Sequence, residues 1–312
     1  MKDIVSLSIN PTIDKSSTVD QVVAERKLRC TAPIFEPGGG GVNVSRAIKK
    51  LGGESTLIYA AGGLSGGMLR GLLEEEGLTS RLVPIEGMTR ESFAVLEEST
   101  GRQFRFGMPG PQMRGEEWEG ALEEVAATAP QSGFIVASGS LPPGVPADFY
   151  GQVAKVGKRA GSKVIVDTSG DPLKKALDEG VYLIKPNLRE FRELLDRDLR
   201  EEAEIEAGAR ELVAGGGCEL LVISLGSAGA LFVSRDGVAH MRPPTVSIVS
   251  KVGAGDSMVA GITLSLARGM APQDAVLFGI ASGAAAVMTP GSELCRREDA
   301  ERLYEKLRAD QS

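Results

Sequence analysis

The run Phe134-Ile135-Val136-Ala137-Ser138 begins the stretch of sequence that decides the fold. Three further apolar runs of strand length follow at 163–167, 182–185 and 219–224, and segments of helix length separate them. Short apolar strands that alternate with helices are typical of a mostly parallel sheet with helices on both faces. The sequence therefore predicts a doubly wound α/β fold.

The same alternation extends toward both ends of the chain, and we expect a single domain, 1–312. Further strands are expected at 4–9 and 55–60, and helices at 43–51, 67–76, 116–127, 147–159, 201–214, 254–268, 272–288 and 297–308. In an open parallel sheet, ligands bind at the carboxyl ends of the strands. We therefore expect the functional residues to follow the apolar runs.

Two segments, 14–37 and 81–108, interrupt this alternation. They contain no convincing helix but do contain stretches of alternating polarity, such as Gln103-Phe104-Arg105-Phe106. Such alternation predicts strands of a small separate sheet, inserted into the α/β body as a lid. Because a small sheet with apolar faces is only marginally stable alone, we expect a homodimer through the lid sheet.

The composition excludes several classes of function. Of the 312 residues 42% are hydrophobic, enough for a large core, and the net charge is −7. An acidic chain is not expected to bind nucleic acid or a membrane surface. No apolar run has transmembrane length or the pattern of a signal peptide, and the three cysteines (Cys30, Cys218 and Cys295) lack metal-site spacing. We expect a cytoplasmic protein with free thiols.

The chain contains a single histidine, His240. A Ser-His-Asp or Cys-His enzyme, or a zinc site that contains histidine, would depend on this residue. Residues 237–244 are typical of a hairpin strand that ends in a turn, where an exposed structural histidine is expected. Acid–base chemistry is therefore assigned to Asp, Glu, Lys or Tyr.

A loop that becomes a helix carries the run Gly253-Ala254-Gly255-Asp256. The glycines leave backbone N–H groups free to bind an anion, and the helix dipole adds positive potential there. A carboxylate weakens the affinity of such a site for anions, so Asp256 is interpreted as a proton acceptor beside a phosphate that is transferred. Asp is also a favoured helix N-cap, and the local sequence does not separate these two roles.

A second glycine cluster, Gly38-Gly39-Gly40-Gly41, precedes Asn43. It has neither the Lys-Ser/Thr of a P-loop nor the GxGxxG spacing of a dinucleotide site. Four glycines let a bulky polar ligand approach the backbone closely, and Asn43 offers an amide to a hydroxyl group. The alternative interpretation is a flexible hinge of the lid.

The third cluster follows the apolar strand that ends at Lys185. Asn187 and Glu190 lie one helical turn apart, and an amide and a carboxylate at this spacing suit a hydrated Mg²⁺. A capping box fits the same spacing equally well. The turn after the next strand is suited to nucleotide phosphates or ribose, although alone it is weak evidence, and its candidates are Ser224, Gly226 and Gly229.

In their order along the chain, the three clusters resemble those of the PfkB/ribokinase family of sugar kinases. The run at 27–41, with the segments 139–144 and 183–187, is similar to the bacterial type 2 (minor) 6-phosphofructokinases, a branch of that family. The resemblance covers essentially the whole chain. It implies a ribokinase-like fold and ATP-dependent phosphorylation of fructose 6-phosphate at its 1-hydroxyl group, a step of glycolysis.

The resemblance also implies a role for each matched residue. Asp256 would be the general base, with an anion hole formed by Gly253, Ala254 and Gly255. The sugar hydroxyls would bind Asp14, Gly38, Gly39 and Asn43, and the 6-phosphate would bind Lys27 and Arg90, with Gly139 on the pocket wall. MgATP would bind Lys185, Asn187 and Glu190, the ion being held through water, and the nucleotide would be bordered by Ser224, Gly226 and Gly229.

One segment departs from the wider family. Many members have Asp-Thr shortly before the Gly-Ala-Gly-Asp run, whereas this chain has Ser250-Lys251-Val252. The resemblance to relatives with a monovalent-cation site implies a K⁺ site formed by Ser250, Val252, Ala286, Thr289, Gly291 and Glu293. Because Lys251 brings its own positive charge near that site, activation by K⁺ stays open.

Three functions compete at this point. The first is a 6-phosphofructokinase, and the second is a related kinase of the same family, either a tagatose-6-phosphate kinase or a 1-phosphofructokinase. The third is a sugar-phosphate sensor without turnover. Sensing does not require a base, so the presence of Asp256 together with both candidate Mg²⁺ residues argues against the sensor.

Overall fold

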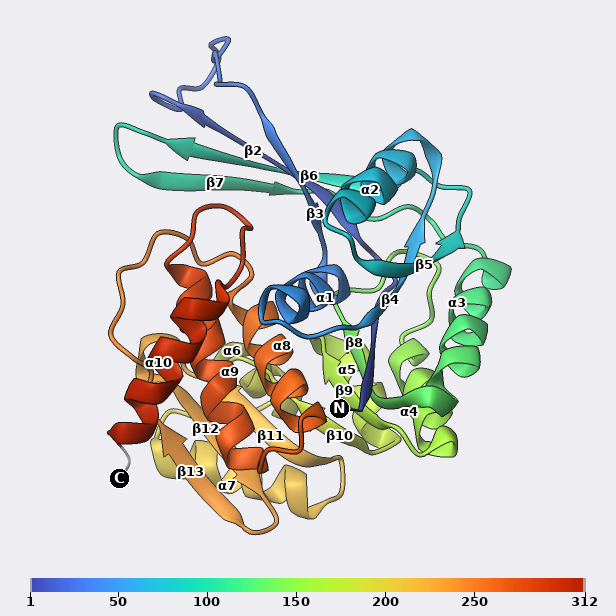
Figure 1. Cartoon of the computed structure of the whole chain (residues 1–312), viewed down its shortest axis with the longest axis vertical. Coiled ribbons are helices and arrows are strands. Elements are labelled where there is room, and N and C mark those ends of the chain that lie inside the picture. The colour runs from blue at the N-terminus through green and yellow to red at the C-terminus, as the bar shows by residue number, and fades with distance from the viewer. Residues whose placement is uncertain (1, 311–312) are drawn as a thin grey trace.

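A nine-stranded sheet forms the centre of the molecule (Figure 1). The computed structural model describes residues 2–310. The strands are β1 (Asp3–Ser8), β4 (Thr56–Ala61), β5 (Thr79–Pro84), β8 (Ser132–Ser138), β9 (Lys163–Asp167), β10 (Val181–Ile184), β11 (Cys218–Ser224), β12 (Ala230–Ser234) and β13 (Gly237–Met241). Their order is β13-β12-β11-β10-β9-β8-β1-β4-β5. The pairs from β11 to β5 are parallel, and β12 and β13 add an antiparallel hairpin at one edge.

Helices cover both faces of this sheet. One layer contains α1 (Gly40–Lys50), α8 (Ala254–Ala267), α9 (Pro272–Val287) and α10 (Arg297–Ala309), and the other contains α3 (Gly115–Thr128), α4 (Phe149–Ala160), α5 (Gly170–Asp178), α6 (Leu188–Leu195) and α7 (Glu202–Ala214). Successive side chains of a strand point to opposite faces, so Ile4 of β1 packs in the first core and Val5 in the second. Helix α2 (Gly63–Glu75) packs in a third, smaller core at the base of the lid.

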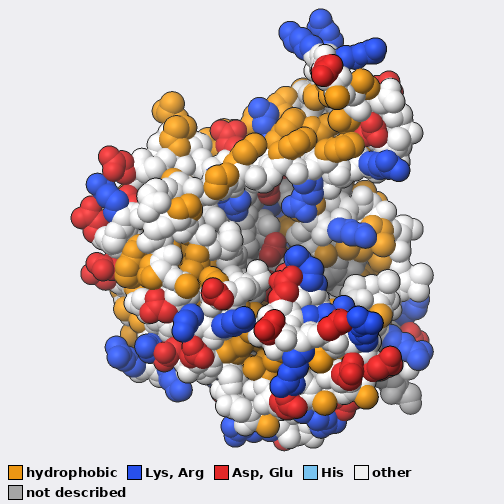
Figure 2. All heavy atoms as spheres, turned by 180° about the vertical axis from the view of Figure 1, so that it is seen from behind, with side chains coloured by type: hydrophobic (Ala, Val, Ile, Leu, Met, Phe, Trp, Pro, Cys, Tyr) orange, Lys and Arg blue, Asp and Glu red, His pale blue; other side chains and the backbone are white. Residues whose placement is uncertain are grey.

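The lid is a separate four-stranded sheet that extends from the α/β body (Figure 1). Its strands are β2 (Thr12–Val19), β3 (Ile34–Gly38), β6 (Arg90–Glu97) and β7 (Arg102–Gly107), in the order β3-β2-β6-β7. Hydrophobic side chains are exposed along it, and Lys and Arg side chains gather at its tip (Figure 2). The exposed hydrophobic residues include Ile34, Leu96, Phe106 and Met108.

The structure confirms the predicted fold class, and each of the six predicted strands lies within two residues of an observed one. Residues 79–84 form β5, which pairs with β4 in the main sheet, so the second lid segment begins at Arg90 rather than at residue 81. Helix α5 was not expected, and of α6 only the first turn at Asn187–Glu190 was. They have nine and eight residues, too few for a helical period to stand out in the sequence.

The two central strands, β1 and β8, mark the point where the strand order reverses. From β1 the chain continues to β4 and β5 on one side, and from β8 it continues through β9, β10 and β11 on the other. A crevice forms at such a point, outside the carboxyl ends of the strands. The site is therefore expected next to the residues that follow β1 and β8.

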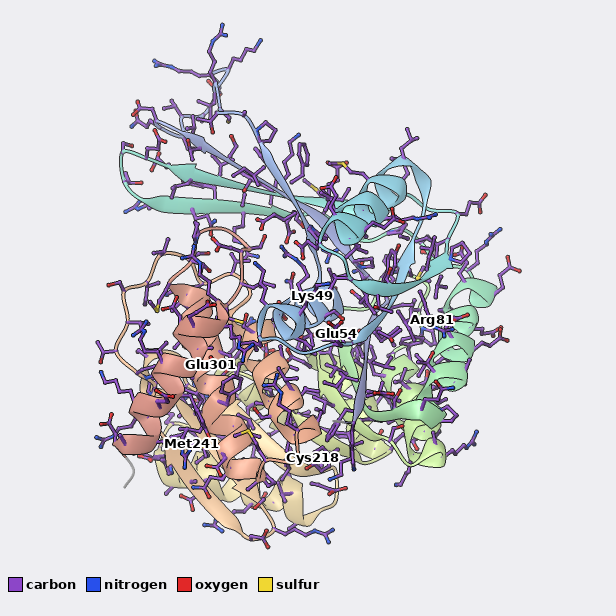
Figure 3. All side chains as sticks on the ribbon, in the orientation of Figure 1. Lys49, Glu54, Arg81, Cys218, Met241 and Glu301 are labelled. Carbon is purple, nitrogen blue, oxygen red and sulfur yellow. The ribbon has the colours of Figure 1, made fainter. Side chains whose placement is uncertain are left out.

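The structure describes the surroundings of all three cysteines. All three cysteines are free; Cys30 is exposed and the other two are buried. Cys218 lies at the amino end of β11, at the end of the strands that points away from the lid (Figure 3). Within residues 2–310, no helix is both long enough and apolar enough to cross a membrane.

Candidate active site

A cavity of about 640 Å³ opens at the carboxyl ends of the central strands. The surface is visibly hollowed between the lid and the body, with charged side chains inside the hollow (Figure 2). Seven residues predicted from the sequence line this cavity: Gly139, Lys185, Asn187, Glu190, Ser224, Gly255 and Asp256. Segments as far apart in sequence as those of Gly40 and Asp256 thus meet at the carboxyl ends of the strands, as predicted.

Asp256 lies in the first turn of α8 and faces Asn43 of α1. The Nδ2 atom of Asn43 donates a hydrogen bond to Oδ2 of Asp256 over 2.9 Å. Burial, followed by the nearby charge of Asp167, raises the pKa of Asp256 to about 6, against the opposing effects of Asn43 and Lys185. A carboxylate with this pKa is ionised at neutral pH and is a stronger base than an ordinary Asp, as general-base catalysis requires.

The N-cap of α8 is Gly253, not Asp256, so the capping interpretation of Asp256 is wrong. Gly253 has a left-handed backbone with φ of 73°, and a Cβ atom added there would lie 2.2 Å from Cδ2 of Leu294. The N–H groups of the first turn have no partner within the helix. Together with the helix dipole they form a site for an anion directly beside Asp256.

Asp167, at the end of β9, is a further site residue that the sequence reading did not include. Its Oδ1 atom lies 3.4 Å from Nζ of Lys185, which is 6% exposed. Burial lowers the pKa of Lys185, but the charges of Asp167 and Asp256 outweigh this effect and raise it. Lys185 therefore remains a cation in the cavity wall. Asp167 could have been found from its position, because it is a carboxylate at the carboxyl end of a predicted strand.

Asn187 and Glu190 form a complete capping box at the start of α6. Oδ1 of Asn187 accepts from the backbone N of Glu190 over 3.0 Å, and Oε2 of Glu190 accepts from the backbone N of Asn187 over 2.9 Å. Both residues also line the cavity. The two interpretations are therefore compatible, because the capping box fixes side chains whose remaining oxygen lone pairs are free for a ligand.

A second, smaller cavity of about 250 Å³ lies between the lid sheet and the loops around Val252 and Gly291. Asp14 of β2 lines it, and burial raises the pKa of this carboxyl although the charges of Arg90 and Arg105 oppose the rise. The charge of Asp14 in turn contributes to the raised pKa of Asp256. A charge in the wall of the smaller cavity thus acts on Asp256 in the wall of the larger one.

Close packing against the backbone explains the second glycine cluster. A Cβ atom added at Gly38 would lie 2.2 Å from Oδ2 of Asp14, and one added at Gly39 would lie 2.9 Å from Cα of Pro11. Gly39 also has a φ of 103°. The cluster thus lets the lid strand β3 pass directly beside Asp14 before α1 begins, which a hinge alone would not require.

Arg90 is held at the junction of the lid and the body. Its Nε and Nη2 atoms donate to the main-chain oxygen of Asn10 over 3.4 and 3.1 Å, and Nη1 donates to the main-chain oxygen of Met108 over 3.3 Å. The side chain of Asn10 donates to Oγ of Ser140, which lines the larger cavity. Asn10 and Ser140 were not predicted, since neither belongs to a glycine cluster.

Several predicted residues of the sugar and nucleotide sites line neither cavity: Lys27, Gly38, Gly39, Asn43, Arg90, Gly226, Gly229, Gly253 and Ala254. Lys27 is exposed near the tip of the lid, between β2 and β3. Gly226 and Gly229 lie in the turn after β11, where only Ser224 reaches the cavity. A Cβ atom added at Gly229 would lie 1.9 Å from the main-chain oxygen of Met241, so this glycine is needed for the packing of the hairpin.

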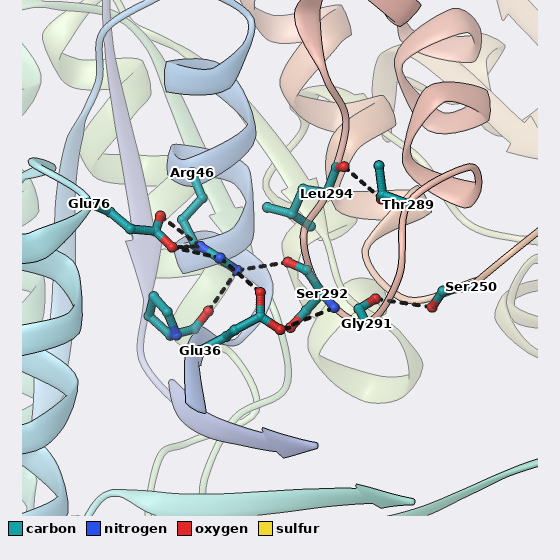
Figure 4. A network of polar contacts seen from close by, with 9 residues as sticks. Glu36, Arg46, Glu76, Ser250, Thr289, Gly291, Ser292 and Leu294 are labelled. Carbon is teal, nitrogen blue, oxygen red and sulfur yellow. Dashed lines mark hydrogen bonds and ion pairs between the residues drawn. The ribbon is translucent and has the colours of Figure 1, made fainter. Parts of the chain in front are cut away.

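The six residues of the predicted K⁺ site lie in two neighbouring segments, 250–252 and 286–293 (Figure 4). Oγ of Ser250 donates to the main-chain oxygen of Gly291 over 3.0 Å. Oγ1 of Thr289 donates to the main-chain oxygens of Ala286 and Leu294, both over 2.8 Å. The side chain of Glu293 is paired with Arg296 over 2.8 Å.

The remaining titratable candidates lie outside the site. His240 is half-exposed beside Glu202 and Glu206, with Nδ1 3.0 Å from Glu202, and it lines neither cavity.

In the part of the chain that the structure describes, no group of three or more His, Cys, Asp or Glu side chains could hold a metal ion. A divalent ion at this site would therefore bind through few protein ligands, as hydrated Mg²⁺ does.

Comparisons with known proteins agree with this geometry. The model of the pfkB family of carbohydrate kinases matches residues 1–299. The ATP-dependent 6-phosphofructokinase isozyme 2 of Mycobacterium tuberculosis is 45% identical over 302 residues, which cover 97% of this chain and 89% of that protein. The crystal structure of phosphofructokinase-2 from Escherichia coli in complex with fructose-6-phosphate has a TM-score of 0.93 and 40% identity, over 99% of this chain and 100% of that one. The same enzyme in complex with potassium has a TM-score of 0.95, with the same identity and coverage.

Proposed function

The chain belongs to the pfkB family of carbohydrate kinases, and from this premise we propose that it is an ATP-dependent 6-phosphofructokinase. The reaction transfers the γ-phosphoryl group of ATP to the 1-hydroxyl group of fructose 6-phosphate and yields fructose 1,6-bisphosphate, a step of glycolysis. The observation that carries this function is full-length identity of 45% and 40% to two enzymes of that activity. The two neighbouring cavities offer room for the two substrates, and Asp256 offers a base for the proton transfer.

In this proposal, Asp256 accepts the proton of the 1-hydroxyl group as the oxygen attacks the γ-phosphorus, and the bond from that phosphorus to the β–γ bridging oxygen breaks, so that ADP leaves. The N–H groups of residues 254–256 bind the charge that develops on the phosphoryl oxygens, and the buried cation of Lys185 lies next to them. Phosphoryl transfer depends mainly on alignment and on charge stabilisation of this kind. The amide of Asn43 fixes one oxygen of Asp256, which leaves the other oxygen for the substrate.

The smaller cavity is assigned to the sugar. The carboxylate of Asp14 binds sugar hydroxyl groups beside the glycine backbone of residues 38 and 39, and Gly139, in the wall of the larger cavity, borders the substrate where it approaches the nucleotide. Arg90 supplies positive charge for the 6-phosphate. Lys27 lies at the lid tip, so its role toward a 6-phosphate requires a second copy of the chain, whose lid would bring it to the neighbouring cavity.

The larger cavity is assigned to the nucleotide, along Lys185, Asn187 and Ser224, with Gly226 and Gly229 shaping the adjacent turn. The oxygen-rich wall fits Mg²⁺, which Asn187 and Glu190 would hold through water. When bound with ATP, this ion neutralises charge on the phosphates. Asp167 lines the same cavity and would offer a further acceptor to this water shell.

A monovalent-cation site is assigned to the segments 250–252 and 286–293. The support comes from the relative that forms a complex with potassium. In this chain the side chain of Lys251 is exposed, so it need not occupy the site itself. Turnover should therefore rise when K⁺ replaces a large organic cation in the assay buffer, and equal turnover in both buffers would remove this part of the proposal.

The substrate is tested by an assay of the purified chain with ATP that is coupled to the release of ADP, the product common to all candidate sugars. Fructose 6-phosphate, tagatose 6-phosphate and fructose 1-phosphate are compared at equal concentrations. The proposal predicts that fructose 6-phosphate has the highest kcat/KM. A higher value for tagatose 6-phosphate or fructose 1-phosphate would identify a related kinase, and binding without turnover would identify a sensor.

A further inference from the structure

Arg46 of α1 is a buried cation that no step of the proposed reaction uses. It is 2% exposed, and its guanidinium group joins four separate segments (Figure 4). Its Nε atom lies 2.9 Å from both carboxylate oxygens of Glu76. Its Nη1 atom donates to the main-chain oxygens of Pro37 and Ser292 over 2.9 and 3.1 Å, and Nη2 lies 3.5 Å from Oε1 of Glu36. A buried charge requires such partners, so Arg46 holds the segments in one arrangement.

Glu36 extends this arrangement from the lid to the body. It belongs to β3, a lid strand, and its Oε2 atom accepts from Oγ and from the backbone N of Ser292 over 2.7 and 3.4 Å. Ser292 lies in the loop between α9 and α10 and is 4% exposed. With the bond from Arg46, every polar group of Ser292 has a partner in this network. The position of the loop therefore depends on the lid strand.

The same loop supports the anion hole. Leu294 is fully buried in a left-handed conformation with φ of 66°, and its side chain packs directly against Gly253 at the start of α8. On the other side, Oγ of Ser250 donates to the main-chain oxygen of Gly291 and accepts from the backbone N of Val252 over 3.2 Å. A displacement of the loop would therefore move the turn that carries the anion-binding N–H groups.

We propose that the contact between Glu36 and Ser292 is a positioning link. It couples the lid strand β3 to the turn at residues 253–256, so that the N–H groups of the anion hole are aligned when the lid has the position seen here. Glu36 lines neither cavity, and Ser292 lines the smaller one, but neither residue belongs to the turn at 253–256 that carries the anion hole. The inference rests on the proposed function, because it assigns a geometric role to the anion hole of that reaction.

Two variants break the link in different ways. Ser292→Ala removes the hydroxyl group and leaves both main-chain bonds, and Glu36→Gln keeps the shape while replacing an acceptor by a donor. Glu76→Gln is the matched control, because Glu76 binds the same guanidinium from the side of α2, away from the loop (Figure 4). All three variants remove one partner from the same network.

Steady-state kinetics and melting temperature are measured for each variant, with whichever sugar phosphate the parent enzyme turns over. For Ser292→Ala and Glu36→Gln we expect kcat to fall about 3- to 30-fold, since an aligned anion hole acts in the transition state. KM for both substrates should stay within about twofold in Glu36→Gln, because Glu36 lines neither cavity, whereas Ser292 lines the sugar cavity and its variant is judged by kcat alone. The kcat of the double variant should be no lower than that of Glu36→Gln alone, because both changes remove the same contact between the two side chains. Glu76→Gln should keep the parent's kcat at a similar loss of melting temperature.

The inference is overturned if all three single variants lose kcat in proportion to melting temperature, or if Ser292→Ala and Glu36→Gln keep the parent's kcat. Either result would mean that the network only stabilises the fold. The parent's own turnover of fructose 6-phosphate is measured first and tests the proposed function separately. A parent that prefers another sugar phosphate would correct the function without deciding the positioning link.

Discussion

At the scale of single residues, the site is governed by carboxylates that share one buried lysine. The charges of Asp167 and Asp256 both raise the pKa of Lys185. Burial raises the pKa of each of the two carboxyl groups, and the charge of Asp167 raises that of Asp256 further. Because Lys185 remains positively charged between them, the cavity can receive phosphate groups in spite of the two acids. The raised pKa of Asp256 is thus a property of the cluster.

The pH dependence of turnover follows from that cluster. A general base must be ionised, so kcat should rise with pH through about 6 and then level off. Asp167→Asn removes a negative charge that raises the pKa of Asp256, so the acidic limb of the kcat profile should move to lower pH. The profile is measured between about pH 5 and pH 8, with the exposed Asp171→Asn in α5 as control. An unmoved limb in Asp167→Asn would contradict the electrostatic assignment.

Arg90 belongs to the same scale, since its charge acts on Asp14 and its side chain is fixed by main-chain oxygens. Arg90→Ala should raise KM for fructose 6-phosphate by about 10-fold or more, as expected for a charged group that binds phosphate, and should leave KM for ATP within about twofold. Arg102→Ala, an exposed arginine of β7, is the control. Equal changes in both KM values would remove Arg90 from the sugar site.

At the scale of elements, the connection from β3 to α1 explains why glycine is required. Gly38 brings the backbone of the lid strand against the carboxylate of Asp14, and Gly39 turns the chain into the helix that carries Asn43. One short connection thus sets the distance between a residue of the sugar cavity and the partner of Asp256.

Gly38→Ala tests this close approach. The added methyl group would overlap with Asp14, and overpacking of this kind typically costs about 1–3 kcal/mol of stability. We expect a lower melting temperature and a higher KM for the sugar phosphate than for Gly115→Ala, where an added Cβ meets no atom within 4 Å. If Gly38→Ala has the parent's KM and melting temperature, the close approach is not required.

The sequence predicted the elements of the main sheet well, because buried parallel strands are marked by their own composition. It also predicted seven residues of the cavity wall, since each follows a strand or begins a helix. Asp167 also ends a predicted strand and could have been assigned by the same rule, although its contact with Lys185 appears only in the fold. Asn10 and Ser140 could not be assigned in this way, because they are linked to each other and to Arg90 by contacts that only the fold brings close.

At the scale of the whole molecule, the lid contacts the body along one side and exposes hydrophobic residues on the other parts of its surface (Figure 2). The six residues of β7 are largely exposed, although two are phenylalanines. Exposed apolar surface on a small sheet indicates an interface. We therefore expect two copies to pair through their lids.

This assembly is tested by light scattering of the purified chain. The mass should correspond to at least two chains, and Ile34→Asp with Leu96→Asp, two exposed residues on one face of the lid sheet, should shift it toward one chain, because a charge in a buried interface is unfavourable. Leu64→Asp, on an 88% exposed residue of α2, is the control. A monomeric parent, or an unchanged mass in the lid variant, would contradict pairing through the lid.

The central claim is that Asp256 takes the proton of the 1-hydroxyl group when ATP phosphorylates fructose 6-phosphate. The most direct measurement is the turnover of Asp256→Asn, with fructose 6-phosphate affinity measured in parallel by calorimetry. The amide keeps the size of the side chain but cannot accept the proton, so kcat should fall by about 10²- to 10⁴-fold while the sugar phosphate still binds. Turnover close to that of the parent enzyme would contradict the claim.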